Sequence, residues 1–247
     1  RNPGHGLMGF VEGYPTNSFF IYEFDGFIKD EADLADYKTK MKGGVPTNLR
    51  VGDAKYVDKD GDGVLEPTLY KEGDPNSGDI VYKGTNNQRY LYGINLGLDW
   101  KGIDISAFLQ GVGKWDCING TYAGGGEVWK QSSQYFYHNT WSPDRPNAEY
   151  PRLTQDGGIH GYNYQWSDAP YKFFNNRYLR LKEVQIGYTF PTTLTKKIGV
   201  EKLRVYATGM NLLEWDNLPN GFDPEAPYTE NLIPFSRTYS IGVNVQF

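Results

Sequence analysis

The C-terminal segment 239–247 alternates strictly between two kinds of side chain. Large apolar residues stand at every second position, and small or polar residues stand between them. A period of two is typical of a β-strand with one apolar and one polar face. The apolar positions are Tyr239, Ile241, Val243, Val245 and Phe247. This pattern excludes a helix here and favours a sheet that is apolar on one side only.

The same alternation occurs on both sides of the dipeptide Lys101-Gly102. The dipeptide is short enough to form a two-residue turn, so the flanking segments 90–100 and 103–110 are predicted to form a hairpin. Weaker alternation predicts three further strands, over 18–27, 178–190 and 203–211. The sequence therefore predicts an all-β chain with six strands.

Composition agrees with sheets and excludes two classes of protein. The 247 residues include 20 Tyr, 13 Phe, 6 Trp and 30 Gly, a bias that favours pleated sheets with many turns. The formal net charge of −5 leaves no basic surface for a nucleic acid. No apolar run approaches the roughly 18 residues that a membrane-spanning helix needs. A transmembrane strand needs only about 10 residues with one apolar face, so a β-barrel remains possible.

The connections between the predicted strands alternate in length: about 60 residues, then 2, about 66, about 12 and about 26. Short periplasmic turns and long extracellular loops alternate in this way in outer-membrane barrels. On this interpretation the segments 28–88, 112–177 and 212–237 face outward, and 101–102 and 191–202 face the periplasm. Because the smallest barrels have about eight strands, six strands supply only part of a wall. A soluble all-β protein with large insertions remains the alternative.

One helix is predicted inside the first long loop, around 34–41. Either Asp30 or Asp33 can cap its start, and Gly43-Gly44 is expected to end it. The second long loop, 112–177, shows no periodic pattern and is expected to be irregular.

An acidic turn begins at Asp58 and opens like a calcium loop. Carboxylates stand at its first, third and fifth positions, and a glycine follows them. The twelfth position, where such loops carry a bidentate acid, is Leu69. A solvated turn rich in Asp and Gly is the alternative. The predicted ligands of a Ca²⁺ ion are Asp58, Asp60, Asp62, the carbonyl of Val64, and Glu66.

Four tryptophans lie in the long loops or next to them: Trp115, Trp129, Trp141 and Trp166. Flat aromatic faces can stack on ring-shaped substrates, so these residues are candidates for contact with a ligand. They can equally pack one loop on another.

No group of residues in the sequence predicts catalysis. His5, His138 and His160 lie far apart and lack the spacing of metal ligands. Asp223 and Glu225 flank a proline and indicate a turn before they indicate an acid–base pair. We therefore predict that the chain is not an enzyme.

Eleven short segments, taken in order, resemble the SusC/RagA group of TonB-dependent outer-membrane transporters. The match runs from about residue 10 to the end of the sequence. The segments are Gly13-Tyr-Pro15, Phe24-Asp-Gly-Phe27, 52–63, 100–108, Trp141-Ser-Pro143 with Pro151-Arg152, Tyr178-Leu-Arg-Leu-Lys182, Gly187-Tyr-Thr-Phe-Pro191, Leu203-Arg-Val-Tyr206, Gly209-Met-Asn-Leu212, Phe222-Asp-Pro-Glu225 and Phe247.

The resemblance implies that residues 1–247 form the C-terminal portion of a transmembrane antiparallel β-barrel, which is plugged and has about 22 strands. It implies a location in the bacterial outer membrane and import of glycans or peptides with a SusD-like surface lipoprotein. The plug domain and the part that contacts the TonB complex would lie outside this sequence. A secreted, calcium-stabilised β-domain that binds or hydrolyses carbohydrate is the alternative function.

The resemblance also implies a role for Tyr239 and Phe247 in assembly. A C-terminal aromatic residue on an alternating strand resembles the signal that the barrel-insertion machinery reads. Aromatic residues that anchor the strand at the membrane interface are a compatible second interpretation.

Overall fold

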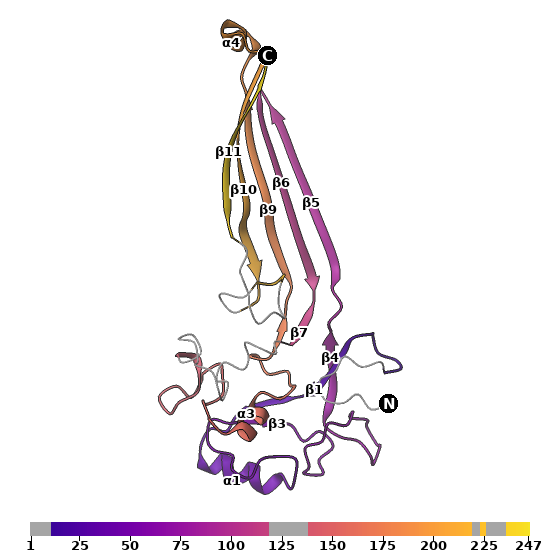
Figure 1. Cartoon of the computed structure of the whole chain (residues 1–247). Helices are drawn as coiled ribbons and strands as arrows, with labels where there is room; N and C mark the ends of the chain where they lie inside the picture. Colours follow the sequence, from indigo (N-terminus) through magenta and orange to yellow (C-terminus); the bar gives the residue numbers. More distant parts are fainter. Residues whose placement is uncertain (1–10, 119–137, 219–222, 226–235) are drawn as a thin grey trace. The chain divides into compact units, whose positions relative to one another are not determined.

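The computed structural model describes residues 11–118, 138–218, 223–225 and 236–247 (Figure 1). These residues form two compact units. The sheet unit comprises the described residues of 88–115 and 175–247, and the loop unit comprises 11–87, 116–118 and 138–174. Among the described residues, no helix combines the length and the apolar character needed to cross a membrane.

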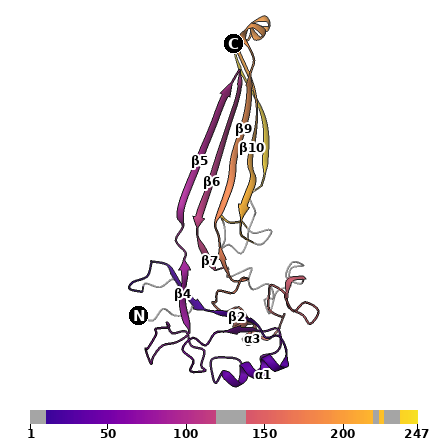
Figure 2. The same ribbon diagram turned by 180° about the vertical axis from the view of Figure 1, so that it is seen from behind.

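The sheet unit is built on five long antiparallel strands, which lie side by side in the order β11-β10-β9-β6-β5 (Figures 1 and 2). All neighbours in this order are paired along most of their length. The strands are β5 Arg89–Trp100, β6 Ile103–Lys114, β9 Tyr178–Thr189, β10 Lys202–Asp216 and β11 Thr238–Gln246.

The strand register turns the alternating sequence into two chemically different faces. One row across the sheet is Leu98, Ile105, Ile186, Ala207 and Ile241. The neighbouring row, on the opposite face, is Gly97, Ser106, Gln185, Thr208 and Ser240. Successive residues of a strand point to opposite faces, so the first row is apolar and the second polar.

The apolar face of the sheet is exposed within this chain. Ile241 is 84% exposed, Leu98 59% and Ile186 51%. Large contiguous apolar surfaces of this kind are rare on soluble monomers and mark contact with lipid or protein. In the part of the chain that the structure describes, β5 and β11 each pair with a strand on one side only.

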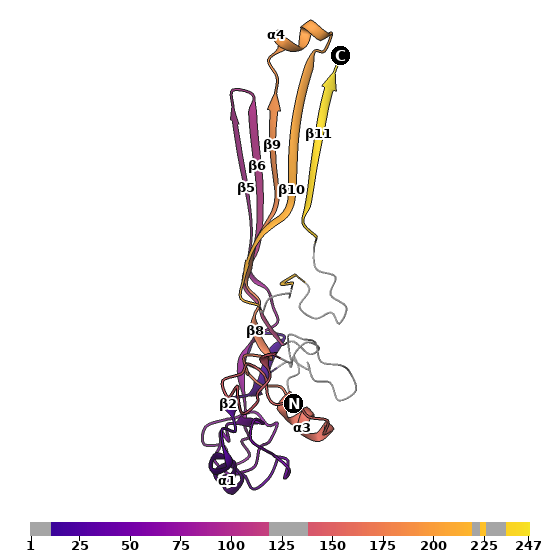
Figure 3. The same cartoon turned by 90° about the vertical axis from the view of Figure 1, so that its left-hand side faces the viewer.

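The β5–β6 hairpin is confirmed. Its turn consists of Lys101 and Gly102, which both have positive φ angles of 49° and 86°, as a two-residue type I′ turn requires. Figure 3 shows this turn at the same end of the sheet as the short helix α4 (Thr192–Thr195). This helix and the 3₁₀ turn η2 (Lys196–Ile198) connect β9 to β10. The short connection over 191–202 is confirmed, whereas its helical turns were not predicted.

One predicted wall strand is wrong. The segment 18–27 forms two short strands, β1 (Ser18–Tyr22) and β2 (Phe24–Phe27). They pair with β4 (Ile80–Thr85) and β3 (Ala54–Tyr56), respectively, in the loop unit and not in the large sheet. All five residues of β1 are buried, because apolar side chains occupy both of its faces. The large sheet therefore has five strands and not six.

The end of β10 also differs from the prediction. The strand was expected to stop at residue 211, yet it continues to Asp216. Its register shifts between Met210 and Leu213, and Asn211 has a φ of 53°. A bulge of this kind reverses the face of the residues that follow, so simple alternation ends there although the strand does not.

The loop unit has a core of its own. Helix α1 (Glu31–Lys40) is confirmed, and the Asp30 side chain caps it by accepting a hydrogen bond from the Asp33 amide. The helix ends before Gly43. Its buried residues Leu34 and Tyr37 join a cluster with Phe20, Ile28, Tyr56, Ile80, Ile159 and Tyr162.

The described residues of 112–177, which are 112–118 and 138–177, contain more regular structure than expected. They include helix α3 (Gly157–Asn163), whose first turn is capped by Asp156. They also include β7 (Asp116–Ile118) and β8 (Phe173–Asn175), which pair with each other. These elements are too short for a periodic pattern to reveal them.

Candidate functional site

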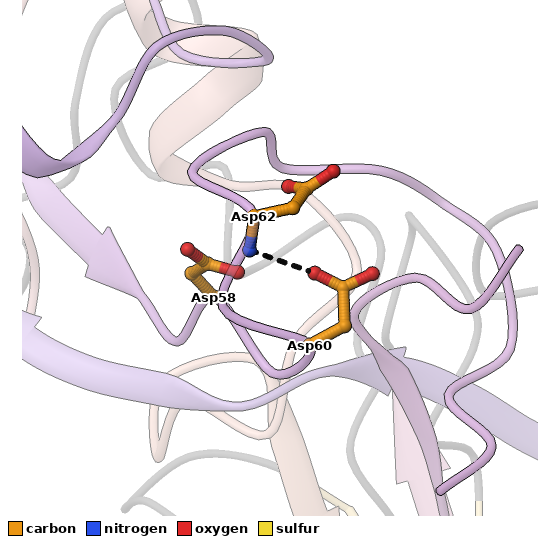
Figure 4. A group of neighbouring side chains, drawn as sticks. All are labelled: Asp58, Asp60 and Asp62. Carbon is orange, nitrogen blue, oxygen red and sulfur yellow. Dashed lines mark hydrogen bonds between the residues drawn. The ribbon is translucent and has the colours of Figure 1, made fainter. Parts of the chain in front are cut away.

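The acidic turn gathers three carboxylates of the loop unit. One oxygen from each of Asp58, Asp60 and Asp62 lies within 4.8 Å of the others. Figure 4 shows these side chains around the turn, with the Asp62 amide donating a hydrogen bond to Asp60 over 3.2 Å. Asp58 accepts hydrogen bonds from the amides of Gly61 and Gly63, each over 2.8 Å. The loop therefore holds its carboxylates through its own backbone.

A buried aspartate closes this loop. The Asp79 side chain is fully buried and accepts hydrogen bonds from the amides of Lys59 (2.6 Å) and Glu66 (2.7 Å). These two amides stand at opposite ends of the acidic turn. Burial raises the pKa of the Asp79 carboxyl above its ordinary value.

The donor set has the chemistry of a site for a hard cation, because Ca²⁺ prefers carboxylate and carbonyl oxygens. The structure brings together three of the predicted ligands, Asp58, Asp60 and Asp62. Glu66 is exposed and is not part of this group, and the Val64 amide donates to Asp62 over 2.6 Å.

The described candidate tryptophans have different surroundings. Trp115 is buried and belongs to the sheet unit. In the loop unit the Trp141 ring lies against Gly52, where a Cβ atom would come within 2.3 Å of it. Trp166 is half-buried and packs on Phe19, Ile21 and Ile118. Trp129 lies outside the described residues.

Among the described candidate tryptophans, Trp166 borders a hollow in the loop unit. This hollow of about 690 Å³ lies between the 44–46 segment and the stretch around the end of α3. Its lining is apolar and aromatic, with one amide side chain. The lining residues are Gly44, Val45, Pro46, Gly161, Tyr162, Tyr164, Gln165 and Trp166. We call this feature the Trp166 hollow.

The sequence points to Trp166 as a ligand contact but not to the rest of this lining. A sequence signal exists, because Tyr162, Tyr164 and Trp166 are aromatic residues at every second position. Their neighbours Val45 and Pro46 come from a distant part of the chain, so no local pattern could have pointed to them.

The polar face of the sheet carries ion pairs that no pattern in the sequence predicts. The Arg204 guanidinium binds Asp104 with two hydrogen bonds and also donates to Gln185 over 2.7 Å. Towards the other end of the strands, buried Arg180 pairs with Glu214 and with Asp223 (2.8 Å).

Asp223 and Glu225 both take part in this second group of ion pairs. Glu225 pairs with Arg180 at 3.0 Å and with Lys182 at 2.7 Å. Since each carboxylate already has a cationic partner, the arrangement holds the chain after β10 against the sheet, and the two acids do not form a free catalytic pair.

Tyr239 lies near the start of β11, and Phe247 directly follows its last residue, Gln246. Phe247 is 88% exposed, and Tyr239 is exposed as well. This position suits aromatic residues at a membrane interface, and their role in assembly stays a prediction.

The fold thus defines a β-sheet wall: antiparallel, with one exposed apolar face, one polar face with ion pairs, and long connections at one end. No family model matches the chain. It is 28% identical to TonB-dependent receptor P3 of Formosa agariphila, over 99% of this chain and 24% of the receptor. It is also 28% identical to TonB-dependent receptor P26 of the same organism, over 80% of this chain and 20% of the receptor.

Solved structures show the same fold. The RagAB peptide importer in its "open-open" state aligns with a TM-score of 0.61 and 23% identity, over 95% of this chain and 23% of that chain. The "closed-closed" state aligns with a TM-score of 0.60 over 98% of this chain. The chain spans about a quarter of the length of the proteins that it matches.

These comparisons confirm the resemblance to SusC/RagA-type TonB-dependent transporters. The relatives are named as receptors and importers and not as enzymes, which confirms the prediction that the chain is not an enzyme.

Proposed function

We propose that this chain forms part of the barrel wall of a TonB-dependent importer in the bacterial outer membrane. The observation that best supports this proposal is the five-stranded sheet, whose apolar face is exposed and whose opposite face is polar. In lipid, an open sheet edge costs several kcal/mol for each unpaired backbone group, so spanning sheets close into barrels. The remaining strands would come from the rest of the transporter.

We propose that the long connections face the cell exterior. The β6–β9 and β10–β11 connections and the segment before β5 all join the sheet at one end, opposite the Lys101-Gly102 turn. Outer-membrane barrels place long loops outside and short turns in the periplasm. A SusD-like lipoprotein would bind these outer loops, and the TonB complex would act through other parts of the transporter.

We propose that the cargo is an oligosaccharide or a peptide and that the Trp166 hollow contacts it. An aromatic-lined hollow beside a few polar groups can accept either class of molecule. The solved structures with this fold are named as peptide importers, which favours peptides.

We also propose that the acidic turn binds Ca²⁺ through Asp58, Asp60 and Asp62. The convergence of their carboxylates supports this proposal, since a divalent cation would offset the repulsion among them. The ion would stabilise the loop and would take no part in chemistry.

Protease treatment of intact cells that make the full transporter tests the location and the orientation together. We expect cleavage of intact cells within the outward segments 28–88, 112–177 and 212–237. The turns 101–102 and 191–202 should be cleaved only after the outer membrane is permeabilised. The protein should stay with the outer-membrane fraction and need detergent for extraction. Extraction in plain buffer, or cleavage at the short turns of intact cells, would contradict the proposal.

A further inference from the structure

Lys172 is a buried lysine without an acidic partner. Only 6% of its surface is exposed, and among the described residues no carboxylate forms an ion pair with it. Other lysines in the loop unit do find acids: Lys55 pairs with Asp33 at 2.8 Å, and Lys83 pairs with Glu23 at 2.6 Å. Burial lowers the pKa of Lys172 to about 8, so the amine is mostly charged at neutral pH.

The recorded contact of the Lys172 ammonium is an aromatic ring. Its Nζ lies 5.3 Å from the centroid of the Trp166 ring. A ring face attracts a cation, yet it replaces only part of the hydration that burial removes. An anion that reached this ammonium would compensate for the remaining loss of hydration.

Trp166 connects this ammonium to the Trp166 hollow, because the same ring borders the hollow. The lining of the hollow contains no aspartate or glutamate to repel an anion. Two polar atoms of its lining residues, Tyr164 Oη and Gln165 Nε2, are buried without a hydrogen-bond partner among the described residues. Both groups can donate a hydrogen bond to an oxygen atom.

We propose that Lys172 recognises a carboxylate group of cargo bound at the Trp166 hollow. Trp166 holds the ammonium in place, and the apolar wall of Val45 and Pro46 contacts the uncharged part of the cargo. The inference rests on the proposed importer function, and it narrows the cargo to acidic molecules. The carboxylate can belong to a peptide or to a uronic acid of a glycan.

Trace acetylation of the full transporter in detergent, with its lipoprotein partner, tests this inference by peptide mass spectrometry. The probes are trialanine against trialanine amide, and digalacturonate against its methyl ester. At about ten times its dissociation constant, an acidic probe should slow acetylation of Lys172 about tenfold, because only the free protein reacts. Exposed Lys71 in the same sample is the reference and should react at an unchanged rate.

The pattern of protection identifies the source of the carboxylate. Protection by trialanine alone assigns a peptide, and protection by digalacturonate alone assigns a glycan. If neither acid protects Lys172 better than its neutral counterpart does, the inference is overturned. The methylene chain of Lys172 is then simply buried, with its ammonium group hydrated.

Two variants separate recognition from folding and from transport. Lys172→Gln should remove the preference of the transporter for the acid over the amide in calorimetric binding, and Lys172→Arg should keep it. A preference that survives Lys172→Gln in a normally folded transporter would overturn the inference. If the unchanged protein prefers the acid but does not insert into the membrane or take up cargo, the importer proposal is contradicted and the Lys172 inference is not.

Discussion

Glu23 illustrates how single residues hold the loop unit together. Its carboxylate accepts hydrogen bonds from Lys59 (2.5 Å) and Lys83 (2.6 Å), and these contacts lower its pKa below the ordinary value of 4.5. A lowered pKa means that the native state binds its proton less tightly than the unfolded state does. The stability that Glu23 contributes is therefore complete above about pH 4.5 and is lost as the pH falls through the native pKa.

We expect the loop unit to lose protection from amide exchange below pH 4.5, and Glu23→Gln to remove part of that pH dependence. Exchange of the β4 amides, measured against pH in the detergent-solubilised transporter, checks this. Identical pH profiles for Glu23→Gln and the unchanged protein would show that the two ion pairs contribute nothing.

A second prediction at the scale of single residues concerns Asp79. Asp79→Ala leaves the amides of Lys59 and Glu66 without this acceptor. Both hydrogen bonds are partly buried, so each lost bond should cost less than the roughly 1–3 kcal/mol of a fully buried unpaired donor. We expect faster proteolysis and exchange across 58–66, with the strands of the large sheet unaffected. Glu72→Ala, at an exposed position nearby, is the control and should change neither rate.

At the scale of the element, the Ca²⁺ site proposed for the acidic turn gives a prediction. If it holds Ca²⁺, chelation with EGTA should speed proteolysis within 58–66, and added Ca²⁺ should reverse this while Mg²⁺ does so poorly. Asp60→Asn with Asp62→Asn should make the unchelated loop behave like the chelated one. A cleavage rate that does not respond to Ca²⁺ would leave the turn held by its backbone hydrogen bonds alone.

The β5–β6 turn gives a prediction at the same scale. Gly102 has a φ of 86°, and a Cβ atom there would lie 2.7 Å from the Thr189 carbonyl oxygen. Gly102→Ala should therefore destabilise the hairpin by about 1–2 kcal/mol from the backbone conformation alone. Gly97→Ala adds the same methyl group where nothing lies within 4 Å. Heat-modifiability on gels should fall for the first variant more than for the second.

Local patterns predicted those elements whose neighbours in space are also neighbours in sequence. The β5–β6 hairpin and α1 are of this kind, because a turn or a cap defines each of them. The segment 18–27 has the alternation of a wall strand, yet Phe19 and Ile21 pack on Ile118 in the loop unit. Its pairing with β3 and β4 depends on contacts that sequence spacing does not contain.

The candidate site could likewise be predicted only where its residues are close together in the sequence. The carboxylates of the acidic turn lie within a few residues of one another, so their convergence could be predicted. Asp79 and Lys172 could not be recognised, because their importance comes from burial. The Trp166 hollow joins segments more than a hundred residues apart, and its only local signal is the alternation of Tyr162, Tyr164 and Trp166.

At the scale of the whole molecule, the two faces of the large sheet should meet different surroundings. Ala107 and Ser106 are neighbours on β6 with similar size, but Ala107 belongs to the apolar row with Leu96 and Val184, and Ser106 belongs to the polar row with Gln185. Either residue can be replaced by cysteine. The native Cys117 is buried and can be replaced by serine.

A fluorescent maleimide on Ala107→Cys or on Ser106→Cys, in the full transporter reconstituted into liposomes, tests the membrane-wall account most directly. Quenching by nitroxide lipids should be strong for the label at 107 and weak at 106, and aqueous iodide should give the opposite order. Equal quenching of both labels by iodide, with no effect of nitroxide lipids, would contradict the assignment of this sheet to a membrane wall.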